Sequence, residues 1–170
     1  MDYGRDSTFL QHINAHIGIA RKVSRVYTED DWQKEDLFQE MMYQLWKSYP
    51  GFKGDSTFST WMYRVCLNTA MTFRKNATRH KARSIPLENH DVPETVKNID
   101  AVEELYAAIA TLERLNKAII LLYLDDLSYE EIASVTGLTK SNVSVRLVRI
   151  KKELENKLRP KDNPESYVNH

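Results

Sequence analysis

Apolar residues recur at helical spacing along most of the chain, in segments separated by short polar breaks. The first segment runs from about residue 7 to residue 26. The second follows an acidic break at residues 29–31 and ends at a Pro-Gly pair at 50–51, and the third begins near residue 56. No useful length of sequence alternates apolar and polar residues as a strand does. The pattern therefore predicts three amphipathic helices in the first half of the chain.

Helical periodicity stops between residues 78 and 100, a segment that holds Pro86, Pro93 and several acidic residues. Such a composition is typical of a solvated, flexible linker. Apolar spacing then resumes and predicts further helices to about residue 160. The expected fold class is all-α, with two small helical domains at residues 1–77 and 101–160. An acidic linker at 78–100 joins them, and a loose tail follows at 161–170.

The distribution of charge matters more here than its sum, which is zero. Residues 53–83 carry seven basic side chains against one acidic, and residues 137–161 carry eight against two. Residues 85–113 carry seven acidic side chains against one lysine, which hides these two basic segments in the total. Since cations supply much of the affinity for nucleic acid, each predicted domain has a candidate nucleic-acid-binding surface.

Several classes of protein find no support in the sequence. There is no apolar run of about 18 residues and no apolar leader, so we expect a cytoplasmic protein without membrane insertion. Cys66 is the single cysteine and is expected to be a buried thiol. No phosphate-binding loop or grouped nucleophile and base is present, so we expect neither enzymatic activity nor a cofactor. His12 and His16 could share a metal, but no third ligand is evident, and surface or interface histidines are favoured.

The segment LSYEEIASVTGLTKSNVSVRLVRIKKEL, which begins at Leu127, has the spacing of a helix-turn-helix. Ser128 and Glu131 can form a capping box at the start of its first helix. Gly137 suits a turn with positive φ, and Thr139 can cap the second helix. An antiparallel helix pair with solvated charges is the alternative interpretation.

In the second helix of this motif, Val143, Leu147, Ile150 and Leu154 fall on one face. The opposite face offers groups that can read bases or contact phosphates, because Asn pairs with adenine, Arg with guanine and Lys with phosphate. The candidate duplex-binding residues are Thr139, Lys140, Ser141, Asn142, Ser144, Val145, Arg146, Arg149 and Lys152.

This motif resembles the promoter-binding helix-turn-helix of region four in extracytoplasmic-function (ECF) sigma factors. Residues 36–76, DLFQEMMYQLWKSYPGFKGDSTFSTWMYRVCLNTAMTFRKN, are similar to regions two-point-two through two-point-four of the same family. The resemblance implies a sigma region 2-like bundle and a region 4-like domain in a transcription initiation factor. Such a factor binds core RNA polymerase and directs sequence-specific promoter recognition.

The resemblance also implies roles for particular residues. Asp36, Gln39 and Glu40 would dock on the polymerase, and the loop at residues 52–57 would capture an unpaired base of the minus-ten element as the duplex opens. We expect Trp61 to be core, and Tyr63 and Arg64 to be more exposed. The candidate minus-ten residues are Lys53, Asp55, Ser56, Thr57, Tyr63, Arg64, Asn68, Arg74 and Lys75.

The second domain would then anchor duplex DNA at the minus-thirty-five element. Ser144 departs from the family pattern, since many relatives have a basic residue there. Members of this family are commonly held inactive by an anti-sigma factor between the two domains, which makes such a protein a further expected partner. Two alternatives remain open from the residues: a dimeric helix-turn-helix regulator that acts without polymerase, and a protein-interaction module.

Overall fold

The structure of the chain is a computed structural model that describes residues 3–73 and 96–159. The first side chains of each range, up to residues 6 and 100, lie outside this description. Within these ranges the chain forms seven α-helices and one short 3-10 helix, and no strand. The predicted all-α fold class is confirmed.

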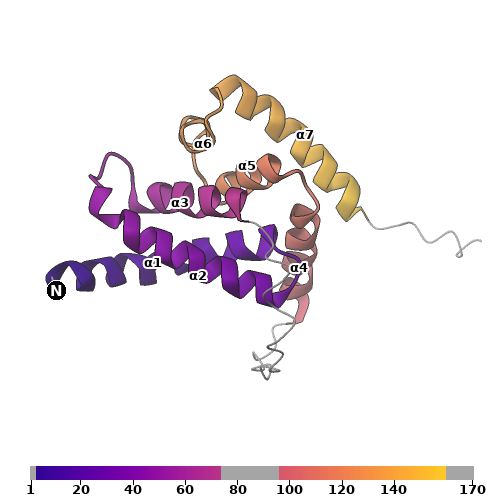
Figure 1. The fold of residues 1–170 in the computed structure, drawn as a ribbon. Coiled ribbons are helices and arrows are strands. Elements are labelled where there is room, and N and C mark those ends of the chain that lie inside the picture. Colours follow the sequence, from indigo (N-terminus) through magenta and orange to yellow (C-terminus); the bar gives the residue numbers. More distant parts are fainter. Residues whose placement is uncertain (1–2, 74–95, 160–170) are drawn as a thin grey trace, which may run out of the picture.

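Three helices form the first bundle (Figure 1): α1 (Tyr3–Tyr27), α2 (Asp31–Ser48) and α3 (Phe58–Thr72). Asp30 caps α2, because its carboxylate accepts the backbone N–H of Gln33 at 2.8 Å. The 3-10 helix η1 (Tyr49–Gly51) follows α2 directly and contains the predicted Pro-Gly stop. The bundle closes over a fully buried core that includes Val23, Leu37, Met41, Leu45, Met62, Cys66 and Ala70.

Four helices form the second bundle: α4 (Val96–Ala110), α5 (Arg114–Leu124), α6 (Tyr129–Thr136) and α7 (Lys140–Leu158). Helix α5 is buried nearly all round, with five consecutive apolar residues from Ala118 to Leu122 in the core. Because a helix that is apolar all round is buried, α5 packs against both α6 and α7. The bundle thereby holds the helix-turn-helix on a rigid support.

The two bundles pack against each other, with α1 on α4 and α5, and α3 on α5 and α6. In Figure 1, α3 lies between α2 and α5. Arg114 donates to the Ala70 carbonyl at 2.7 Å, and Lys117 donates to the Val26 carbonyl at 3.1 Å. These carbonyls belong to the last turns of α3 and α1, and cations are favoured at the C-terminal ends of helices. The second bundle therefore caps two helices of the first.

The element boundaries differ from the predicted ones at two places. Helix α1 begins at Tyr3 rather than near residue 7, and α4 begins at Val96, inside the segment predicted as linker. The rest of that linker, residues 78–95, and the predicted tail at 161–170 lie outside the described residues.

Candidate nucleic-acid interface

The loop between η1 and α3 holds the candidate base-capturing residues. Lys53 and Asp55 are exposed at its tip, on either side of Gly54, whose φ of 80° lies in the left-handed region that favours glycine. Ser56 is half-buried. Thr57 is exposed and is the N-cap of α3, since its hydroxyl accepts the backbone N–H of Thr60 at 3.2 Å. The loop thus offers short polar groups on a well-anchored backbone.

An aromatic cluster lies beneath this loop. We define it as Tyr49, Phe52, Phe58 and Trp61, whose rings lie with centroids 5.2 to 6.5 Å apart. Trp61 is half-buried, in line with its expected core role. Such ring pairs stabilise a fold beyond their buried area, so the cluster fixes where the loop leaves η1 and enters α3.

The two histidines of α1 belong to the same packing. His12 lies 4.8 Å and His16 lies 5.3 Å from the ring centre of Phe58. His12 also shares a hydrogen bond of 3.3 Å with the Tyr49 hydroxyl. Within the described ranges, no group of three metal-ligating side chains comes together. Both histidines are half-buried in the packing between α1, η1 and α3.

Tyr63 and Arg64 are not placed as the sequence suggested. Tyr63 was expected to be exposed, and this expectation is wrong: the residue is 0% exposed and its hydroxyl donates to Asp125 at 2.6 Å. Arg64 is half-buried and donates to the Ser134 hydroxyl at 3.0 Å. Both side chains face the second bundle, whose position a helical pattern within α3 does not reveal. Asn68, by contrast, is exposed.

Arg74 and Lys75, the remaining minus-ten candidates, lie outside the described residues. The candidates that the structure does bring together are therefore the loop residues Lys53, Asp55, Ser56 and Thr57, while Asn68 is exposed further along α3.

The helix-turn-helix has the local geometry that the sequence predicted. The Ser128 hydroxyl accepts the Glu131 N–H at 3.3 Å, and the Glu131 carboxylate accepts the Ser128 N–H at 2.9 Å. This backbone hydrogen bond is the main cause that holds the pKa of Glu131 below its usual range. Gly137 ends α6 with a φ of 74°, and Thr139 caps α7 through the N–H of Asn142 at 3.2 Å.

Helix α7 buries one face and presents the other to solvent. Val143, Leu147 and Ile150 are at most 1% exposed, which confirms the predicted buried face. Ser144 is half-buried. The exposed candidates lie on the first turns and along one side of the helix: Thr139, Lys140, Ser141, Asn142, Val145, Arg149 and Lys152. A helix of this shape fits the major groove of duplex DNA.

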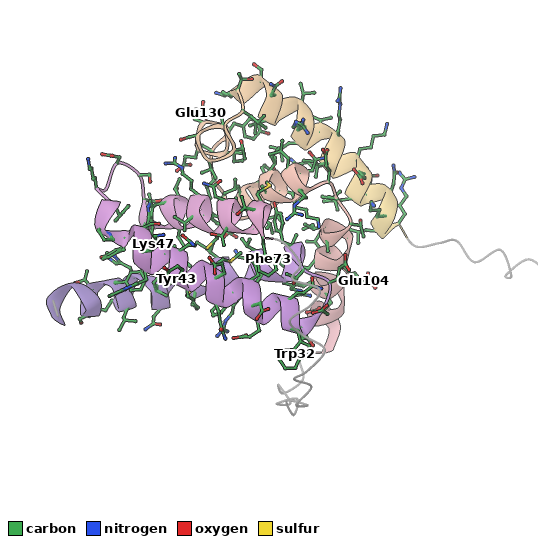
Figure 2. The ribbon with its side chains drawn as sticks, in the orientation of Figure 1. Trp32, Tyr43, Lys47, Phe73, Glu104 and Glu130 are labelled. Atoms are coloured by element: carbon green, nitrogen blue, oxygen red, sulfur yellow. The ribbon has the colours of Figure 1, made fainter. Side chains whose placement is uncertain are left out.

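Two cations of this surface already have partners in the protein. Arg146, expected on the outer face, is half-buried and donates to the side-chain oxygen of Asn116 in α5 at 3.1 Å. Arg146 lies one helical turn after the buried Val143, so its long side chain points toward α5. Lys140 forms an ion pair with Glu130, which is labelled in Figure 2. Arg149 is the exposed arginine within the predicted set.

The candidate polymerase-binding face lies on α2. Gln39 and Glu40 are exposed, and Asp36 is half-buried. Trp32 and Tyr43 of the same helix are labelled in Figure 2 and are 43% and 56% exposed. The sequence analysis missed both residues, although their spacing from Asp36 and Gln39 places them on one side of a helix. The face is therefore amphipathic rather than purely polar.

A helical bundle joined to a helix-turn-helix with an exposed face on its second helix is an architecture typical of DNA-binding transcription proteins. Two family models match the chain: "Sigma-70 region 2" over residues 9–80 and "Sigma-70, region 4" over residues 102–154. The ECF RNA polymerase sigma-E factor of Escherichia coli (strain K12) is 32% identical over 157 residues, which cover 84% of this chain and 81% of that protein. The sigma-E factor of Haemophilus influenzae is 31% identical over 140 residues, 74% of each chain. The chain belongs to the ECF group of the sigma-70 family.

The fold is also similar to two solved structures among others. One is RpoE in complex with the anti-sigma factor NepR from Bartonella quintana, with a TM-score of 0.68, 20% identity, and coverage of 91% of this chain and 98% of that chain. The other is CnrH in complex with the cytosolic domain of CnrY, with a TM-score of 0.63, 19% identity, and coverage of 89% and 87%.

Membership of this family settles the class of function. An ECF sigma factor directs RNA polymerase to promoters and is not an enzyme. This function differs from the two alternatives, a dimeric regulator without polymerase docking and an interaction module. Across residues 3–73 and 96–159, no helix combines the length and apolarity needed to cross a membrane.

Proposed function

We propose that α7 binds the minus-thirty-five element through the exposed side that starts at its N-terminus. The observation that carries this proposal is the division of α7 into a buried face and an exposed face with Ser141, Asn142, Val145 and Arg149. Arg149 suits bidentate pairing with guanine, and Asn142 suits adenine. Arg146 is tied to Asn116, so we assign it a supporting contact in the free protein.

The loop at residues 52–57 and Asn68 form the proposed minus-ten site. A flipped base needs hydrogen-bonding groups along its edge, and the loop supplies hydroxyls at Ser56 and Thr57 and a carboxylate at Asp55. Lys53 adds positive charge toward the phosphates. The aromatic cluster under the loop holds these groups in place.

Helix α2 is the proposed docking surface for core RNA polymerase. Gln39 and Glu40 expose polar and acidic groups that suit a basic partner surface. Trp32 and Tyr43 add exposed apolar area beside them, and aromatic residues commonly anchor protein interfaces.

We also propose that an anti-sigma factor regulates this protein in the cytoplasm, where promoter DNA and RNA polymerase are found. The support is indirect: the similar structure of RpoE is of a sigma factor bound to the anti-sigma factor NepR, and the similar structure of CnrH is of a complex with the cytosolic domain of CnrY.

Run-off transcription with bacterial core RNA polymerase tests the residue assignments. Promoter fragments selected by the wild-type complex serve as templates at fixed salt, because affinity for DNA depends on ionic strength. Arg149→Ala removes a proposed base contact, and Arg159→Ala is its matched control, since Arg159 is an exposed arginine at the end of the same helix.

A lost bidentate contact is worth about 1–3 kcal/mol. Arg149→Ala should therefore weaken minus-thirty-five-dependent transcription about tenfold, and Arg159→Ala should leave it nearly unchanged. Asn68→Ala should reduce transcription from duplex promoters and lose less activity on templates that are already unpaired at the minus-ten element. Equal effects of Arg149→Ala and Arg159→Ala would contradict the assignment of α7.

A further inference from the structure

An ion pair joins the two helices of the helix-turn-helix at their N-terminal ends. Glu130 lies in the first turn of α6, and its carboxylate pairs with the ammonium group of Lys140, the first residue of α7. The hydrogen bond from Lys140 is the largest of the causes that lower the pKa of Glu130, so this carboxylate is ionised at neutral pH. The side chains of Lys140 and Glu130 are 62% and 63% exposed, which leaves both within reach of a bound duplex.

Local helix geometry fixes the position of each partner. The capping box of Ser128 and Glu131 sets the start of α6 and thereby places Glu130 in its first turn. Thr139 caps α7 and leaves Lys140 as the first residue of that helix. The two N-terminal turns therefore lie close enough for a direct contact between side chains that are ten positions apart in the chain.

Lys140 occupies a position that the helix itself does not favour. The dipole of an α-helix is positive at its N-terminus, where acidic side chains are stabilising, whereas cations are stabilising at the C-terminus. Lys157 follows this rule, since it lies in the last turn of α7 and pairs with Glu153 of the same helix. Lys140 differs, because its carboxylate partner comes from α6. Glu130 thus supplies the negative charge that holds an ammonium group at the N-terminal end of α7.

The pairing leaves that ammonium group able to bind DNA. An ammonium group has three N–H donors, and a bond to one carboxylate oxygen uses one of them. Ser141 and Asn142, the next residues of α7, are exposed and belong to the side proposed to enter the major groove. Lysine can donate to the acceptor edge of guanine in that groove, or to phosphates beside it. A lysine held by a carboxylate has one preferred direction, whereas the flexible stem of an unpaired lysine reaches many phosphate positions.

The charge of the pair has a second effect on binding. Attraction between cations and phosphates is the same for every DNA sequence, so it raises specific and non-specific affinity together. Glu130 cancels the charge of Lys140 at a distance, and its carboxylate is itself repelled by phosphates. The pair therefore adds little to the affinity for a sequence that does not offer Lys140 an acceptor at the right place.

From this contact we propose that Glu130 is a positioning residue that sets the selectivity of α7 for the minus-thirty-five element. It directs the Lys140 ammonium group to the acceptor edge of one base pair, and it lowers binding to sequences that lack this acceptor. The inference rests on the proposed function of α7, since a helix that does not read the element has no selectivity to set. It adds to the reading surface a residue of α6 that acts through Lys140 and needs no DNA contact of its own.

Glu130→Gln tests this role in the holoenzyme assembled with core RNA polymerase. The substitution keeps the length of the side chain and removes its charge. Glu153→Gln is the matched control, because Glu153 is an exposed glutamate that also pairs with a lysine, far along α7 from the turn. Lys140→Ala and the double variant Glu130→Gln/Lys140→Ala complete a double-mutant cycle. Circular dichroism checks that each variant is folded.

Two measurements are made on each holoenzyme. One is selection from promoter fragments with randomised minus-thirty-five base pairs, and the other is the ratio of affinities for an intact and a scrambled element at fixed salt. An exposed ion pair changes an equilibrium by up to about fivefold. Glu130→Gln should therefore lower the ratio by about two- to fivefold, raise the affinity for the scrambled element, and relax the same base pair as Lys140→Ala. Glu130→Gln should leave the ratio unchanged when Lys140 is already alanine, and Glu153→Gln should match the wild type.

An unchanged ratio in folded Glu130→Gln, with both affinities raised equally, would show that Glu130 only repels phosphates, and the proposal would be overturned. It would equally be overturned if the ratio fell as far in the Lys140→Ala background, or if a different base pair were relaxed. A failure of the proposed function is a separate result, because Arg149→Ala would then also leave the ratio unchanged. A lowered ratio in Arg149→Ala beside an unchanged ratio in Glu130→Gln overturns this inference alone.

Discussion

Replacing Gly137 with alanine separates backbone strain from packing at the turn of the helix-turn-helix. Gly137 has φ 74° and ψ 14°, and a Cβ atom placed there would meet no other atom within 4 Å. The substitution therefore adds left-handed strain of about 1–2 kcal/mol without a clash. Alanine also lowers the entropy of the unfolded chain, which offsets about 0.5 kcal/mol. The net expected destabilisation is about 1 kcal/mol.

Urea unfolding followed by circular dichroism measures this effect. With an m value of about 2 kcal/mol/M, the midpoint should fall by about 0.5 M. Gly18→Ala is an informative control, because Gly18 is exposed in α1, has no positive φ and likewise has nothing within 4 Å of a Cβ atom. There alanine should stabilise the helix by about 1 kcal/mol. The same substitution thus has opposite signs at the two positions, and a stabilising Gly137→Ala would refute the reasoning.

Three further outcomes are expected. Glu131 has a lowered pKa in the folded state. Its contribution to stability is therefore present above about pH 4.5, the ordinary pKa, and is lost as the pH falls through the lower pKa of the folded state. In thermal unfolding, Glu131→Gln should destabilise the protein at pH 7 and match the wild type near pH 2. Burial raises the pKa of Cys66 to about 12, so its thiol should react with a maleimide at pH 8 only when urea unfolds the chain. Arg146→Ala and Asn116→Ala should each lower the free energy of unfolding by about 1 kcal/mol. In a double-mutant cycle, the double variant should lose less free energy of unfolding than the sum of the two single losses, and strict additivity would show that the contact is absent.

The features that the sequence predicted well depend on residues close together in the chain. The capping box of Ser128 and Glu131 and the left-handed Gly137 each involve fewer than five consecutive residues, so local geometry alone decides them. The buried face of α7 follows from helical periodicity in the same way. For these features the family resemblance and the physical pattern point to the same structure.

The features that it missed depend on contacts between distant segments. Tyr63 looks like an exposed residue on the wheel of α3, and only the arrival of Asp125 from α5, 62 positions later, buries it. Arg146 is drawn inward by Asn116, 30 positions earlier. The start of α4 at Val96 was hidden because prolines and acidic residues precede it closely. Pattern within a helix shows which side is apolar, whereas the packing between helices decides which polar residues are covered.

Thr57 combines two demands in one hydroxyl group. The group caps α3 through the Thr60 N–H and also lies within 3.0 Å of the Ser59 hydroxyl, at the edge of the loop proposed to hold a base. Among residues with a side chain, helix capping alone favours Thr, Ser, Asp and Asn at this position. If natural sequences keep one residue type at position 57, the cause can be folding as much as promoter choice. Exchange among those four residue types would let the loop change its base preference while α3 still begins at the same residue.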